Sequence, residues 1–195
     1  DMQTLFNMAP WLFLFLIPAI TMRTFAEEKR EGTIELLLTK PITDLQLILG
    51  KYFAALLLAL FALIPTLLYY YTVYELGNPQ GNIDSAAVVG SYLGLVFLAS
   101  VFTAIGVFAS SVSDNQIISF VIAIFLCYIF YTGFELIASI PVWGSFSYII
   151  SQLGIAYHYS AISKGLIDSR DVLYFLSVVA LMVLSTKLVL SSRKW

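Results

Sequence analysis

The chain has 195 residues, of which 60% are hydrophobic and only 11% are charged. An ordinary soluble domain carries about 25% charged residues, so this composition excludes that class and indicates an integral membrane protein. The net charge of −2 and the dispersed Lys and Arg residues argue against binding to nucleic acid.

Five apolar runs are long enough to cross a bilayer, which takes about 20 helical residues. They cover residues 5–22, 52–74, 86–110, 117–136 and 172–190. Lipid cannot satisfy free backbone N–H and C=O groups, so we expect each run to be a helix. Pro18 and Pro65 are expected to kink two of them, and Gly90 and Gly94 permit a close helix contact in the third. The predicted fold class is an all-α polytopic membrane helix bundle, a single transmembrane domain over residues 1–195.

The basic residues are distributed unevenly between the two sides of these spans. One side carries two, Lys164 and Arg170, and the other carries eight: Arg23, Lys29, Arg30, Lys40, Lys51, Lys187, Arg193 and Lys194. The positive-inside rule places the richer side, with the C-terminus, in the cytoplasm of an inner (plasma) membrane. Five spans then leave Asp1 outside. Because the chain begins with Asp rather than Met, we expect one further spanning helix upstream, which makes six in the full chain.

The segment between the first two runs, residues 23–51, holds ten of the 22 acidic and basic residues. Three capping-box patterns predict helix starts here and in the loop at residues 111–116: Thr24-x-x-Glu27, Thr43-x-x-Gln46 and Ser113-x-x-Gln116. The loop at residues 111–116 is therefore expected to be a tight turn rather than a partner contact. Residues 33–38 join an apolar cluster to one acid, which predicts a short amphipathic helix parallel to the membrane.

Glu27, Glu31 and Glu35 recur at four-residue spacing, so an unbroken helix would stack three like charges on one face. Each such pair disfavours a helix by about 0.2–0.5 kcal/mol. Two interpretations stay open. Either Arg23 and Arg30 compensate these acids within a solvated helix, or the acids form a surface that docks onto another subunit.

The segment at residues 139–169, on the outer side, is too aromatic for a solvated loop and too interrupted by Gly and Pro for one span. We expect an extracytoplasmic re-entrant hairpin of two short helices, because irregular backbone at membrane depth must be buried in protein. Four aromatic residues would pack this hairpin or gate a path through it: Trp143, Phe146, Tyr148 and Tyr157.

Other classes of protein find little support in the sequence. The one histidine, His158, lies among aromatic residues without a nucleophile in the pattern, so no catalytic residue is predicted. No cluster of His, Cys, Asp or Glu predicts a metal site, and the single Cys127 excludes an intrachain disulfide. A channel or a passive membrane scaffold stays open as an alternative, since one subunit does not reveal an oligomeric pore.

The charged segment resembles the first cytoplasmic loop of type-2 ABC exporter permeases. The resemblance lies in the residues that follow the spanning helix, in this order: Arg23, Phe25, Glu27, Glu31-Gly32-Thr33, Glu35, Leu36-Leu37, Pro41 and Gly50-Lys51. Within that class the chain is most similar to the permease subunit of the gliding-motility-associated ABC transporter. The copper-linked permeases of nitrous oxide reductase assembly are the alternative.

The resemblance implies a non-catalytic subunit that couples ATP hydrolysis by a partner to substrate export or to transmission of force. It implies a coupling helix seated on an ATP-binding cassette subunit, two of which pair with this permease half and a second one, the same or homologous. The implied contact residues are Glu27, Glu31, Gly32, Thr33, Glu35, Leu36 and Leu37, with Pro41 at the exit turn. This chain lacks a P-loop, because Tyr52 follows Gly50-Lys51. ATP and Mg²⁺ are therefore expected on the partner, with no cofactor here.

Overall fold

A computed structural model describes residues 2–34, 39, 41–77 and 84–192. All regular elements in these ranges are helical, and the all-α bundle is confirmed. Five stretches are long and apolar enough to cross a membrane, and each contains one of the predicted runs: Met2–Arg30, Asp44–Leu76, Ser85–Val112, Gln116–Ala138 and Ser169–Ser191. A span upstream of Asp1 stays a prediction.

The first two spans each consist of two helices. The elements up to the third span are α1 (Met2–Thr21), α2 (Ala26–Arg30), α4 (Asp44–Phe61), α5 (Ile64–Leu76) and α6 (Ser85–Val112). The break between α4 and α5 falls at Ala62 and Leu63, directly before Pro65, whose ring disfavours helix in the preceding residues. A kink was predicted at Pro65, and the structure has a break between two helices next to it. Pro18 lies inside α1, which runs without a break, so a kink there stays a prediction.

The remaining elements form the fourth and fifth spans and the segment between them. They are α7 (Gln116–Tyr128), the π-helix η1 (Ile129–Gly133), α8 (Phe134–Ala138), the 3₁₀ helix η2 (Pro141–Phe146), α9 (Ser147–Ser151), α10 (Ile155–Ser163) and α11 (Ser169–Ser191). The segment at residues 139–169 thus contains two short α-helices, as predicted, with a 3₁₀ helix before them. Its depth in a membrane stays a prediction.

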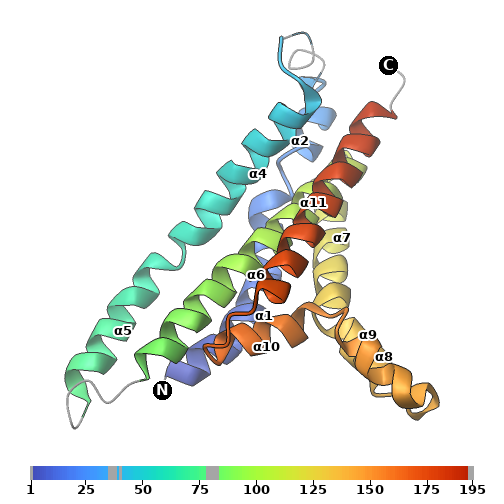
Figure 1. Cartoon of the computed structure of the whole chain (residues 1–195). Helices are drawn as coiled ribbons and strands as arrows, with labels where there is room; N and C mark the ends of the chain where they lie inside the picture. The colour runs from blue at the N-terminus through green and yellow to red at the C-terminus, as the bar shows by residue number, and fades with distance from the viewer. Residues whose placement is uncertain (1, 35–38, 40, 78–83, 193–195) are drawn as a thin grey trace.

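The central helix of the bundle is α6, which packs against α1, α4, α7, α10 and α11 (Figure 1). Most of its side chains are buried, and Leu95 and Phe102 are completely enclosed. Gly106 lets α1 approach closely, because a Cβ at this position would lie 2.0 Å from the Thr21 hydroxyl oxygen. The outward faces of the other helices expose large apolar side chains such as Leu188, as expected of a surface that meets lipid.

Helix α4 begins with the predicted capping box. The Thr43 side chain accepts a hydrogen bond from the Gln46 backbone, and the Gln46 side chain accepts one from the Thr43 backbone, at 3.3 and 3.0 Å. The box predicted at Ser113 is wrong. Asn115 caps α7 instead, with its Oδ1 atom 2.9 Å from the Ile117 nitrogen, because the Ser113 hydroxyl is taken by the Asn115 backbone N–H at 3.1 Å.

Candidate functional site

The short helix α2 lies at one end of the bundle, where the chain turns between α1 and α4 (Figure 1). Its C-terminus is a Schellman turn. The Thr33 backbone N–H donates to the Glu28 carbonyl at 2.9 Å, and the Gly32 N–H donates to the Lys29 carbonyl at 3.3 Å. Gly32 has φ of +70°, a conformation that costs a side-chain-bearing residue about 1–2 kcal/mol. This glycine therefore ends the helix.

The N-terminus of α2 is capped from another helix. The Ser110 hydroxyl of α6 accepts hydrogen bonds from the Phe25 and Ala26 backbone N–H groups, at 2.9 and 3.1 Å, and donates to the Met22 carbonyl at 3.0 Å. The Thr24 hydroxyl instead donates to the Thr21 carbonyl at 2.6 Å. The capping box predicted at Thr24 is thus wrong: the Thr24 hydroxyl is directed to the preceding turn, and a hydroxyl from α6 binds backbone N–H groups at the start of α2.

Apolar side chains fasten α2 to the bundle as well. Phe25 and Ile34, on either side of α2, lie in a buried cluster with Ile48 of α4, Val107 of α6 and Leu190 of α11. Phe25 and Ile48 are fully enclosed. Removing a side chain of this size from water contributes about 1.5–3 kcal/mol. The cluster therefore joins the α2 region to three spanning helices.

Two lysines complete this attachment. Lys51 of α4 donates to the Thr24 carbonyl, forms an ion pair with Glu28, and lies 4.9 Å from the centre of the Phe25 ring. Lys29 donates to the Ser111 carbonyl at the end of α6. Both lysines and Glu28 are partly buried, so these contacts are screened less than surface ion pairs. They tie α2 to α4 and α6.

The predicted coupling residues divide into two groups. Glu35, Leu36 and Leu37 lie outside the described residues, as does most of the amphipathic helix expected at residues 33–38. The others lie on α2, on its C-terminal turn, or at the approach to α4: Glu27 and Thr33, which are half-buried, and Glu31, Gly32 and Pro41, which are exposed. The structure thus groups Glu27, Glu31, Gly32 and Thr33 within little more than one turn of chain.

The chain does not run through these acids as one unbroken helix, because α2 ends at Arg30 and Gly32 turns the chain. The separation expected near Gly32 is present, and Glu35 lies outside the described residues. Within the described ranges, Glu27 and Glu31 form no ion pair with Arg23 or Arg30. The internally compensated helix is not what the structure contains.

The aromatic residues predicted to pack or gate the outer segment are exposed, by 41% at Trp143, 67% at Phe146, 60% at Tyr148 and 37% at Tyr157. Two of them meet: the Tyr148 and Tyr157 rings lie edge to face with centroids 6.3 Å apart and hydroxyls at 3.3 Å. That hydrogen bond raises the pKa of Tyr148 and lowers the pKa of Tyr157. Trp143 and Phe146 contribute no ring contact among the residues described. Ring packing there therefore involves two of the four aromatic residues, Tyr148 and Tyr157.

A buried pair at this outer segment escaped the sequence analysis. His158 of α10 places its Nδ1 atom 2.6 Å from the Asp171 carboxylate of α11 and its Nε2 atom 2.8 Å from the Gln152 carbonyl. Its ring stacks on Tyr174 at 3.9 Å between centroids. The pair joins α10 to α11. Asp171 at the start of a span could have indicated this pair, because a carboxylate that is buried needs a hydrogen-bond partner.

Comparison with known proteins agrees with this architecture. No curated protein sequence matches the chain. The family model described as ABC-2 family transporter protein matches residues 3–192. This range includes α2 and all five spans, except for Met2 at the start of the first span. The chain belongs to the ABC-2 transporter family and is a membrane-spanning permease subunit of an ABC transporter.

Proposed function

We propose that this permease is half of an ATP-driven exporter and that the α2 region receives movement from an ATP-binding subunit. ATP and Mg²⁺ bind on that partner, of which two copies pair with this chain and a second permease half. The match to the ABC-2 family supports a partner of this kind. The absence of a P-loop from the sequence supports hydrolysis outside this chain.

The attachment of α2 is the observation that carries this proposal. A force applied to a loop moves a transmembrane helix only if the loop cannot yield first. Helix α2 is fixed to α6 through Ser110, to α4 through Lys51, and to both through the cluster around Phe25. Arg30 and Glu31 meanwhile stay exposed. This arrangement presents charges outward and connects them to the central helix.

The uneven distribution of Lys and Arg supports an inner-membrane protein with α2 and the C-terminus in the cytoplasm. A cysteine introduced at Arg23 would then resist an impermeant thiol reagent added from outside, and one at Ser169 would react. The similarity of the charged segment supports a role in gliding motility. Deletion of the gene in its host, followed by measurement of surface motility, tests that assignment.

The coupling site is tested in the full complex with its ATP-binding subunit, reconstituted in nanodiscs. The variant Glu27→Ala/Glu31→Ala changes side chains that contact a partner and leaves the Ser110, Lys51 and Phe25 contacts unchanged. We expect normal membrane insertion, together with weaker copurification of the ATP-binding subunit or hydrolysis no longer coupled to transport. Truncating a desolvated interface anchor costs about 2 kcal/mol or more, whereas surface charges contribute about 0–1 kcal/mol to folding.

Asp114→Ala is the matched control. Asp114 is an exposed acid in the turn between α6 and α7, at the same end of the bundle as α2. The Asp114→Ala substitution removes a charge near the expected partner without changing α2, so assembly and coupling should stay normal. An equal loss in the control would indicate a general electrostatic effect. Normal coupling in the double variant would reduce the α2 surface to a solvated loop.

A further inference from the structure

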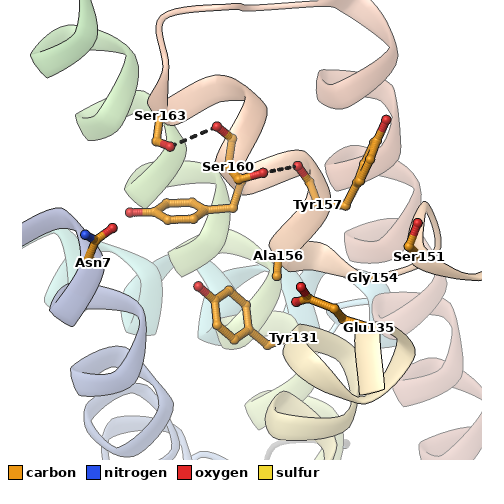
Figure 2. A pocket seen from close by; sticks show the side chains of 10 residues that line it. Asn7, Tyr131, Glu135, Ser151, Gly154, Ala156, Tyr157, Ser160 and Ser163 are labelled. Carbon is orange, nitrogen blue, oxygen red and sulfur yellow. Dashed lines mark hydrogen bonds between the residues drawn. The ribbon is translucent and has the colours of Figure 1, made fainter. Parts of the chain in front are cut away.

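A polar cavity lies at the end of the bundle opposite α2, between α1, the fourth span and α10 (Figure 2). Its volume is about 300 Å³, at the lower limit of small-molecule sites. Its lining combines an amide, a carboxylate and several hydroxyls with the apolar surface of tyrosine rings and Ala156. None of the predicted coupling residues contributes to it, and the proposed transport mechanism does not use it.

Each serine hydroxyl that lines this cavity donates its proton to a backbone carbonyl. Ser151 donates to the Tyr148 carbonyl at 2.8 Å, Ser160 to the Tyr157 carbonyl at 2.8 Å, and Ser163 to the Ser160 carbonyl at 3.0 Å. A hydroxyl has one proton and two lone pairs. Toward the cavity these oxygens therefore present lone pairs alone, and they are acceptors.

Three further polar groups at the cavity have no hydrogen-bond partner among the described residues. They are the Asn7 amide of α1, the Tyr131 hydroxyl and the Glu135 carboxylate. Tyr131 is only 8% exposed, and in Figure 2 its hydroxyl points to the side on which Asn7 lies. The ring of Tyr131 is packed while its hydroxyl stays accessible from the cavity, so this oxygen is available to a ligand.

The charge of the lining selects the sign of that ligand. Glu135 supplies a carboxylate, and no Lys, Arg or His lies among the residues described as lining the cavity. Two basic residues adjoin the lining in sequence: Lys164 lines an adjacent hollow, and His158 is paired with Asp171. A site with one carboxylate and several lone pairs suits a cation that has N–H bonds to donate. An anion would meet repulsion here, and a quaternary ammonium would leave the acceptors unsatisfied.

We propose that this cavity binds a primary ammonium group, held by the Glu135 carboxylate and by the Tyr131 oxygen. An ammonium has three N–H donors, which matches the surplus of acceptors. The volume accommodates a headgroup-sized amine rather than a polymer. Two sources share this chemistry, the headgroup of an aminophospholipid and a soluble small amine. The assignment goes beyond the proposed coupling to ATP and does not depend on it.

The test uses the full chain in nanodiscs. Native mass spectrometry would compare retention of phosphatidylethanolamine and phosphatidylcholine, and titration calorimetry would compare ethanolamine and choline. We expect the ethanolamine forms to bind more tightly than the choline forms. Glu135→Gln keeps the side-chain shape and should weaken that binding about tenfold or more, because a charge-assisted hydrogen bond is lost. Tyr131→Phe keeps the ring and should weaken it less.

Glu75→Gln is the matched control, since Glu75 is an exposed acid at the same end of the bundle and outside this cavity. It should bind as the unmodified chain does. Binding of the phospholipid alone identifies a lipid source, and binding of free ethanolamine identifies a soluble amine. The proposal is overturned if neither binds, if choline forms bind equally well, or if Glu135→Gln leaves binding unchanged in a protein that elutes and folds normally.

Discussion

The two ends of the central helix α6 hold their neighbouring segments in opposite ways. Near its C-terminus α6 supplies a side chain, the Ser110 hydroxyl, which binds the backbone on both sides of the start of α2. Near its N-terminus α6 carries glycines, which have no side chain, where it meets α10. A Cβ on Gly90 would lie 2.6 Å from the Ile162 carbonyl oxygen of α10, and a Cβ on Gly94 would lie 3.2 Å from the Tyr159 ring.

This difference bears on what each end does. Helix α10 packs closely against the glycines of α6. The Ser91 hydroxyl donates to the Ser163 carbonyl at 3.0 Å, and the Tyr159 hydroxyl donates to the Phe6 carbonyl at 2.9 Å. Helix α2 is held by directional hydrogen bonds from Ser110, Lys51 and Lys29 and by one apolar cluster. We therefore expect removal of atoms to be damaging where α6 meets α2, and addition of atoms to be damaging where α6 meets α10.

The largest effect is expected from the buried pair between α10 and α11. Asp171→Ala leaves the part-buried His158 without its carboxylate, and a hydrogen bond to a charged group contributes about 1.5–3 kcal/mol. Thermal unfolding in nanodiscs, followed by near-ultraviolet circular dichroism, measures the change. The double variant His158→Phe/Asp171→Ala keeps the stack on Tyr174 and should recover part of the loss. If the double variant is no more stable than the single one, the pair is not the source of the effect.

A smaller loss is expected at the other end of α6. Ser110→Ala removes the acceptor shared by two backbone N–H groups, and each of these neutral hydrogen bonds contributes about 0.5–1.5 kcal/mol. Chemical denaturation of the reconstituted protein measures it. The control is Ser185→Ala, because the Ser185 hydroxyl donates to the Leu181 carbonyl of its own helix. Equal stability of the two variants would contradict the role given to Ser110.

The close contact of α6 with α10 predicts that one added methyl group is harmful there. Gly90→Ala forces backbone to move, which costs about 1–3 kcal/mol. Gly50→Ala is the matched control in α4, where a Cβ meets nothing within 4 Å. Alanine is the better helix former, so that control should gain up to about 1 kcal/mol. Opposite signs in thermal unfolding would confirm the contact, and equal signs would exclude it.

The smallest effect concerns the turn after α2. Gly32→Ala meets no neighbouring atom but forces a side-chain-bearing residue into φ of +70°, at a cost of about 1 kcal/mol. Gly32→Asn should cost less, because asparagine tolerates this conformation. Hydrogen exchange at the Thr33 amide, which is bonded to the Glu28 carbonyl, reports the loosening directly. Unchanged protection in both variants would mean that Gly32 does not hold the turn.

Much of the fold was predictable because lipid imposes a simple rule. Runs of apolar residues must satisfy their own backbone as helices, so the five spans follow from hydropathy alone. The capping box at Thr43 was equally local and is confirmed. The boxes at Thr24 and Ser113 carried the same pattern and failed, because Ser110 and Asn115 offered competing oxygens. Local patterns predict a cap only where no better partner folds against it.

Composition and hydropathy determined the class, the helical spans and the interruption at Pro65, since each depends on a short stretch of chain in a known solvent. Tertiary structure alone decided that α6 is central, that Ser110 caps α2 from 84 residues away, and that His158 meets Asp171. The cavity lined by Tyr131 and Glu135 also has no counterpart in any single segment. These features arise where separate helices meet, and the order of residues along one helix does not specify which neighbour it will face.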